Sequence, residues 1–239
     1  MTMTDLHTHI LPGMDDGAAD VEQSLAMLAM EAEQGVTRVA LTPHFYPKRE
    51  SVCDFLTRRQ AAYDRLTEAI SRLPETERAR LPKMYLGAEV AWQSDLLDCA
   101  DLSGLCLGDG RYMLVELPFT AWNRQTVRQL WELMACHGIT PVIAHLERYL
   151  ADQSSKMVDS LLELDIPVQI SCDILGHVFA RRRAMKLLRS GQAHLIATDC
   201  HDCSHRAPNM ARGLSVLTAK LGRERVEELQ EYARTLVDH

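Results

Sequence analysis

The chain has 239 residues, of which 46% are hydrophobic, 25% are charged and 5% are aromatic, and its formal net charge is −7. The apolar fraction is typical of a globular protein and excludes a disordered chain. The acidic balance disfavours broad binding to nucleic acid or to anionic membranes. At face value it also disfavours an anionic substrate.

Three further features bear on the cellular context. No apolar run approaches the roughly 18 residues that a membrane helix needs, so we expect no membrane insertion. Residues 1–5 contain no basic leader followed by a hydrophobic region, which favours a protein that is not exported. The seven cysteines are odd in number and scattered, as expected of a reduced, cytoplasmic protein. The oligomeric state remains open.

Short apolar strands alternate with amphipathic helices along the chain. We expect seven strands, at about residues 4–9, 36–41, 83–90, 112–116, 140–144, 167–170 and 193–198. We expect helices at about residues 20–34, 53–72, 124–137, 154–164, 178–189, 208–221 and 223–237. The first helix has a clear start at Asp20, with Gln23 three residues later, and a clear stop at Gly35. Residues 74–82 are expected to form a charged connector.

The alternation of strands and helices implies parallel strands joined by right-handed crossovers. Seven such units fit either a closed barrel or an open, doubly wound sheet. A dinucleotide-binding sheet carries a glycine-rich phosphate loop after its first strand, and this sequence has none there. The sequence therefore predicts an α/β protein with one barrel-like domain over residues 1–239.

Imidazole and carboxylate side chains gather at the ends of these strands. Asp5, His7 and His9 alternate along the first strand and therefore point to one face. The carboxyl ends of parallel barrel strands share one rim, where barrel active sites are built. The other residues at or just past strand ends are Asp15, Asp16, His44, Glu89, Glu116, His145, Asp199 and His201. Because such groups are costly to bury unless they are paired or bind metal, their convergence predicts a polynuclear site for zinc, manganese or iron.

Six motifs give the chain a family resemblance. The first, DLHTHILPGMDDG at residues 5–17, resembles the opening motif of the polymerase-and-histidinol-phosphatase (PHP) superfamily. More closely, the chain is similar to the bacterial manganese-dependent protein tyrosine phosphatases encoded with capsule and exopolysaccharide genes. The resemblance continues, in order, with GAE at 87–89, LVEL at 114–117, GITPVIAHLERY at 138–149, ATDCH at 197–201 and RAPNM at 206–210.

The resemblance implies a fold, a cofactor and a set of site residues. The fold is a distorted TIM-like barrel of seven β/α units. The cofactor is three divalent metal ions, expected to be manganese, with iron or zinc as alternatives. Glu89 is implied to bridge two metals, and Arg148 and Arg206 to bind phosphate. The implied metal ligands are His7, His9, Asp16, His44, Glu89, Glu116, His145, Asp199 and His201. The loop at residues 45–51 departs from the family pattern, which leaves the substrate-facing rim undefined.

The expected activity is hydrolysis of phosphotyrosine by a metal-activated hydroxide, without a phosphoenzyme. Arg148 and Arg206 are expected to hold the phosphoryl oxygens, with His205 nearby in the substrate site. Asp199, His201 or His205 is a candidate acid for the leaving group. By resemblance, the partner is an autophosphorylating bacterial tyrosine kinase that regulates capsule or exopolysaccharide biosynthesis.

Several other readings compete with this one. Cys53 with Arg59, and Cys200 with Arg206, match the Cys-x5-Arg spacing of cysteine-dependent phosphatases, but no glycines surround the second match to let the backbone wrap a phosphate. A metal-dependent amidohydrolase is disfavoured because no lysine lies between residues 83 and 156 to bridge metals as a carbamate. A PHP-type phosphatase of histidinol phosphate or another small phosphomonoester remains the stronger rival. A non-catalytic, metal-binding regulatory module is the alternative of another class.

Overall fold

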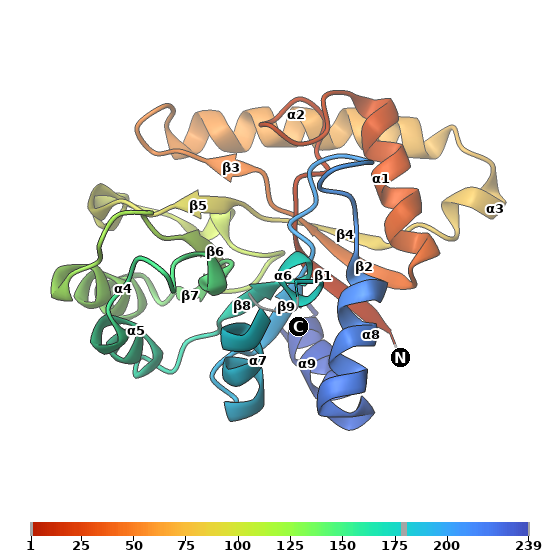
Figure 1. The fold of residues 1–239 in the computed structure, drawn as a ribbon. Helices are drawn as coiled ribbons and strands as arrows, with labels where there is room; N and C mark the ends of the chain where they lie inside the picture. The colour runs from red at the N-terminus through yellow and green to blue at the C-terminus, as the bar shows by residue number, and fades with distance from the viewer. Residues whose placement is uncertain (1, 178–180, 239) are drawn as a thin grey trace.

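Parallel strands form the centre of the molecule, and helices surround them (Figure 1). The computed structural model describes residues 2–177 and 181–238. The strands are β1 (Met3–Thr8), β2 (Val36–Leu41), β3 (His44–Phe45), β4 (Lys83–Leu86), β5 (Glu89–Ala91), β6 (Tyr112–Glu116), β7 (Thr140–Ile143), β8 (Gln169–Ser171) and β9 (Leu195–Ala197). The α-helices are α1 (Val21–Glu33), α2 (Val52–Ser71), α3 (Glu75–Arg78), α4 (Arg124–His137), α5 (Ser155–Leu162), α6 (Cys172–Leu175), α7 (Arg181–Ser190), α8 (Met210–Leu221) and α9 (Arg223–Thr235). Short 3-10 turns are η1 (Ser94–Asp98), η2 (Ser103–Leu105) and η3 (Leu146–Arg148).

The strands pair in parallel as three sheets, in the orders β1-β2-β4, β3-β5-β6-β7 and β8-β9. Single parallel bridges link the sheets: Thr8 pairs with Cys200 just after β9, and Ile143 in β7 pairs with Val168 just before β8. The predicted α/β class and parallel strand direction are therefore confirmed. In the described residues the strands pair as three separate sheets and not as one continuous barrel sheet.

One predicted strand is divided in two. The sequence pattern predicts a strand over residues 83–90, but the structure has β4 followed by β5, with Gly87 and Ala88 between them. Gly87 donates its N–H to the carbonyl of Leu41 at 3.0 Å, at the end of β2. Beyond this point the pairing partner changes from β2 to β3, which was not predicted as a strand. The change of partner places His44 of β3 directly opposite Glu89 of β5.

The helices follow their local signals closely. Asp20 caps α1 by accepting the N–H of Gln23, and Gly35 follows the helix with a φ of +89°. Asn123 and Thr126 form a reciprocal capping box at the start of α4, which ends at the left-handed Gly138. The predicted connector 74–82 contains the short helix α3. Residues 178–180 of the helix predicted at 178–189 lie outside the described residues, and α7 covers the rest.

Helix α9 covers one face of the strands. Six strands contribute to an apolar cluster with Ala233, Leu236 and Val237 near the C-terminus: Leu6, Ala40, Tyr85, Leu114, Val142 and Leu195. Side chains alternate along a strand, so His7 points to the face opposite Leu6. This arrangement directs the imidazole away from the apolar cluster under α9.

Within residues 2–177 and 181–238, no helix combines the length and the apolar character that crossing a membrane requires. All seven cysteines are free thiols.

Candidate active site

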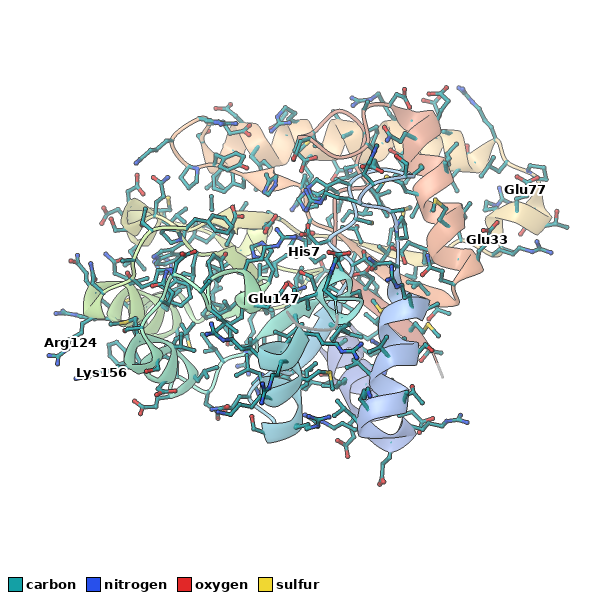
Figure 2. All side chains as sticks on the ribbon, in the orientation of Figure 1. His7, Glu33, Glu77, Arg124, Glu147 and Lys156 are labelled. Atoms are coloured by element: carbon teal, nitrogen blue, oxygen red, sulfur yellow. The ribbon has the colours of Figure 1, made fainter. Side chains whose placement is uncertain are left out.

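The ends of the strands bring imidazole and carboxylate groups into one cluster that is largely buried, although the side chain of Asp16, from the loop after β1, is 67% exposed. His7 and His9 come from β1 and the residue just after it, and both are fully buried. Figure 2 shows His7 in the interior of the molecule, whereas Glu33, Glu77, Arg124 and Lys156 lie at its edges. Three sets of potential ligand atoms each lie within 4.8 Å of one another: His9, Asp16, His44 and His201; His7, His9, Glu89 and Asp199; and His44, Glu89 and Glu116.

Glu89 lies at the centre of the cluster and is only 1% exposed. Its Oε2 is 3.1 Å from His7 Nε2, 3.3 Å from His9 Nε2 and 2.9 Å from His44 Nδ1. Its Oε1 is 2.8 Å from His145 Nε2. His145 is the one predicted ligand that is not in the three sets, and this contact places it beside the others. Burial opposes ionisation of this carboxyl, but the surrounding imidazoles hold its pKa well below its usual range. Glu89 is therefore an anion shared by several imidazoles.

Asp199 provides the second central carboxylate. Its Oδ1 is 3.3 Å from His7 Nε2 and 3.4 Å from His9 Nε2. Its Oδ2 accepts hydrogen bonds from the guanidinium groups of Arg148 and, at 2.8 Å, of Arg206. Asp199 adopts a φ of +55° and His145 a φ of +32°, values that are uncommon outside glycine and that gather at functional sites.

The donor atoms match those that divalent metal ions require. The Nε2 atoms of His7 and His9 face each other at 3.2 Å, and the same two carboxylates approach both. His145 Nδ1 and His201 Nε2 are buried without a hydrogen-bond partner. Imidazole nitrogens and carboxylate oxygens form the mixed ligand set preferred by manganese, iron and zinc. The residues present therefore fit divalent ions.

Without a cation, the cluster retains protons. Burial lowers the pKa of the two imidazoles on β1, but the nearby carboxylates more than reverse this and raise the pKa of both His7 and His9. Burial, together with the charge of Glu89, raises the pKa of Glu116 to about 7. Burial and the neighbouring His9 lower the pKa of His201 to about 4. A bound cation would displace the protons from His7, His9 and Glu116.

Two residues position the ligands: Asp15, which the sequence places near the site without a role, and Gln169, which the sequence does not indicate. Asp15 accepts a hydrogen bond from His9 Nδ1 at 2.7 Å, and from the backbone N–H groups of Gly17 at 2.9 Å and His44 at 2.8 Å. Gln169 Oε1 accepts the N–H of His145 at 2.7 Å and lies 3.3 Å from His7 Nδ1. Asp15 stands beside Asp16 in the first motif and is among the residues expected at the strand ends, but the resemblance implies only Asp16 as a metal ligand. Gln169 lies in β8, and no pattern distinguishes it.

His205 and Asp5 were also candidate site residues. His205 is exposed. Its ring Nδ1 is 3.1 Å from Ser204 Oγ, and its backbone N–H donates to Asp202 Oδ1, so neither contact connects it to the cluster. Asp5 is in none of the three sets of potential ligand atoms; it accepts hydrogen bonds from Thr198 and from the backbone N–H of His7.

Neither Cys-x5-Arg match forms a cysteine nucleophile site. Cys200 is buried, and burial followed by the charge of Glu31 raises the pKa of its thiol well above the usual range, so the reactive thiolate is suppressed. Cys53 lies in the helix α2, and the partner of its match, Arg59, is buried and donates to the carbonyl of Gly87 at 2.7 Å. The cysteine-phosphatase interpretation is therefore disfavoured by the geometry as well as by the sequence.

Comparisons with known proteins find relatives that match nearly the whole chain. The tyrosine-protein phosphatase CpsB of Streptococcus pneumoniae is 29% identical over 95% of this chain and 94% of its own length. The tyrosine-protein phosphatase YwqE of Bacillus subtilis is 28% identical over 98% of this chain and 91% of its own length. A crystal structure from work on YwqE and CpsB, described as unique metal-dependent tyrosine phosphatases, matches with a TM-score of 0.79 and 27% identity, and covers 98% of this chain and 94% of that chain. The family model for capsular polysaccharide synthesis, CpsB/CapC, matches residues 3–236, and the chain belongs to this family.

Proposed function

We propose that this chain is a metal-dependent protein tyrosine phosphatase that regulates capsular or exopolysaccharide biosynthesis. The observation that carries the proposal is the buried cluster around Glu89 and Asp199, with two arginines directed at Asp199 from the rim. A purely structural metal site has no need of two partly exposed guanidinium groups beside it. The relatives named as tyrosine-protein phosphatases support the same assignment.

The proposed cofactor is three divalent ions, with manganese preferred over iron and zinc. The nine ligands are His7, His9, Asp16, His44, Glu89, Glu116, His145, Asp199 and His201. The presence of three sets of potential ligand atoms supports three ions, and Glu89 belongs to two of these sets. Divalent ions in such sites supply Lewis acidity and a hydroxide nucleophile at neutral pH.

The chain's own residues bind and orient the ester. Arg148 and Arg206 offer planar guanidinium groups that bind phosphoryl oxygens by charge-assisted hydrogen bonds. Asp199 holds both groups in place through its Oδ2. A tyrosine phenolate has a pKa of roughly 10, so it departs with less protonation than an alkoxide needs. We therefore assign no obligatory acid to the departure of the leaving group.

Further proposals concern the molecule as a whole. The bridges at Thr8–Cys200 and Ile143–Val168 support closure of the three sheets into one distorted seven-unit barrel of a single domain. The seven free cysteines support a reduced, cytoplasmic location. The proposed protein substrate is an autophosphorylating bacterial tyrosine kinase.

A metal-removal assay tests the function. We expect the purified protein to hydrolyse a phosphotyrosine peptide, to lose this activity with a chelator and to regain it with added manganese. Alkylation of the exposed thiols of Cys53, Cys136 and Cys203 should leave the activity intact. Histidinol phosphate should be a poorer substrate. Loss of activity on alkylation alone would support a cysteine nucleophile, and faster turnover of histidinol phosphate would support the small-substrate alternative.

The arginine assignment has its own test. We expect Arg206→Ala to lower kcat/KM for the peptide by about 10- to 100-fold, because each charge-assisted hydrogen bond contributes about 1.5–3 kcal/mol. Arg223→Ala is the matched control, since Arg223 forms an exposed i,i+4 pair with Glu227 on α9. Equal effects of the two substitutions would contradict a phosphate-binding role for Arg206.

A further inference from the structure

An exposed aromatic ring stands next to the metal-ligand cluster. Phe119 follows β6 by three residues, and 55% of its surface is exposed to solvent. A single exposed apolar side chain is common on protein surfaces. What distinguishes Phe119 is its position against His145, one of the proposed metal ligands.

Other aromatic groups hold this ring in place from one side. The Phe119 ring stacks on the imidazole of His145, with centroids 6.3 Å apart and an interplanar angle of 16°. It also packs against Tyr149, with centroids 5.0 Å apart. Tyr149 is itself fixed, because its hydroxyl accepts the N–H of Leu117 at 3.1 Å and its ring packs on Trp122. Phe119 is thus a supported platform with a free surface.

A cavity lies beside this platform. Its volume is about 540 Å³, within the usual range for pockets that bind small organic groups. Its walls include Trp92, Pro118 and Phe119, and it reaches Glu116, one of the proposed metal ligands. The cavity therefore borders the proposed metal site at Glu116. The aryl ring of a phosphotyrosine ester is separated from its phosphorus by a single oxygen, so it must lie in a space of this kind.

We propose that this cavity binds the aromatic ring of phosphotyrosine and that Phe119 stacks on that ring. This inference rests on the proposed function and names the substrate class that the site selects. The metal cluster and the arginines contact only the phosphoryl group, which is the same in aryl and alkyl esters. Phe119 distinguishes the two, because aromatic pairs gain stacking energy beyond their buried area, and an alkyl chain lacks this gain.

Kinetics of Phe119 variants test this inference. Phe119→Ala is expected to raise KM for a phosphotyrosine peptide about tenfold with kcat nearly unchanged, because the ring contact is made equally in the ground state and the transition state. The inhibition constant of inorganic phosphate should stay the same, since phosphate uses only the cluster and the arginines. Phe119→Trp keeps an aromatic ring at this position, so its KM should be close to that of the unmodified chain. Trp131→Ala is the matched control, because Trp131 is 56% exposed on α4.

Each outcome separates this inference from the proposed function. If the unmodified chain does not hydrolyse the phosphotyrosine peptide, the proposed function fails and the ring subsite fails with it. If it does so, and Phe119→Ala weakens inhibition by phosphate as strongly as it raises KM, then Phe119 supports His145 and does not contact the substrate ring. An unchanged KM in Phe119→Ala would overturn the inference while leaving the phosphatase function standing.

Discussion

The orientation of single imidazoles controls the chemistry of the cluster. The hydrogen bond from His9 Nδ1 to Asp15 keeps a proton on Nδ1 and directs Nε2 towards Glu89 and Asp199, so that Nε2 is the atom that would bind a metal ion once its competing proton is lost. Asp15 also binds the backbone N–H groups of Gly17 and His44. These bonds lower the pKa of Asp15 even though burial opposes the change, so this carboxylate stays charged. Asp15 is thus a positioning residue whose own oxygens are already occupied.

Replacement of Asp15 tests this role. Asp15→Asn keeps the shape of the side chain but weakens the bond that orients His9, and we expect the affinity for manganese to fall about 10- to 100-fold. The affinity is measured by titration of the metal-free protein. Asp101→Asn is the matched control, because Asp101 also accepts a backbone N–H, that of Ser103, on an exposed loop. Unchanged manganese affinity in Asp15→Asn would contradict the positioning role.

The loop between β1 and α1 carries Asp15 and Asp16, and its Asp15 binds the backbone N–H of His44 in β3. The N–H of Ala18 donates to the carbonyl of His9 at 2.9 Å, and the N–H of Gly13 donates to the carbonyl of Ala18 at 2.8 Å. The loop thus folds directly onto the backbone of His9. A Cβ atom at Gly17 would lie 2.2 Å from the carbonyl oxygen of His9 and 2.5 Å from its Cβ. The loop has no room for a side chain at this position.

A methyl group at Gly17 should therefore displace the loop. We expect Gly17→Ala to lower the free energy of unfolding by about 1–3 kcal/mol, the usual cost of overpacking, and to weaken manganese binding as Asp15 and Asp16 move. Gly104→Ala is the matched control, since its Cβ would meet only the side-chain end of Leu56, at 2.6 Å, which can rotate away. Denaturant unfolding compares the two variants. An equal loss of stability in both would show that the backbone contact at Gly17 is unimportant.

Local signals and long-range pairing differ in how well they could be predicted. Helices α1 and α4 carry their start and stop residues in the sequence, and the structure places both where the pattern predicts them. The division between β4 and β5 depends on a change of partner strand, which no local pattern encodes. The site residues show the same difference between local signals and long-range contacts. The strand-end pattern indicated residues that the fold brings together, whereas Gln169 reaches His7 and His145 only through tertiary structure.

At the scale of the whole molecule, the acidic composition and the proposed phosphate-binding site are compatible. The formal net charge of −7 includes the carboxylates of the cluster, four of which are proposed ligands: Asp16, Glu89, Glu116 and Asp199. The three divalent ions proposed for this site would more than neutralise these charges locally, because a bound ion is often the largest charge in a site. Net charge therefore does not exclude an anionic substrate when the negative groups are gathered around metal ions.

Metal binding should also stabilise the whole fold, and its effect should depend on pH. At a manganese concentration about 100 times Kd, one site contributes about 2.7 kcal/mol, which raises Tm by about 5–10 °C for a chain of this length. His7, His9 and Glu116 have raised pKa values and hold protons that compete with the ion. Their protonation stabilises the metal-free chain at low pH, and this contribution is lost as the pH rises through the raised pKa values. The Tm difference between manganese and chelator should therefore widen from about pH 6 to about pH 8.

Thermal unfolding at several pH values measures this difference directly. His201 adds little to it, because burial lowers its pKa to about 4 and it is already neutral across this range. Burial also lowers the pKa of His145. Glu116→Gln should give a smaller change with pH, since one of the competing protons is absent. A Tm difference that stays constant, or that grows towards acid pH, would contradict proton–metal competition in the cluster. A difference that widens with pH in the unmodified chain and less so in Glu116→Gln would link the buried charges of the strand ends to the stability of the entire molecule.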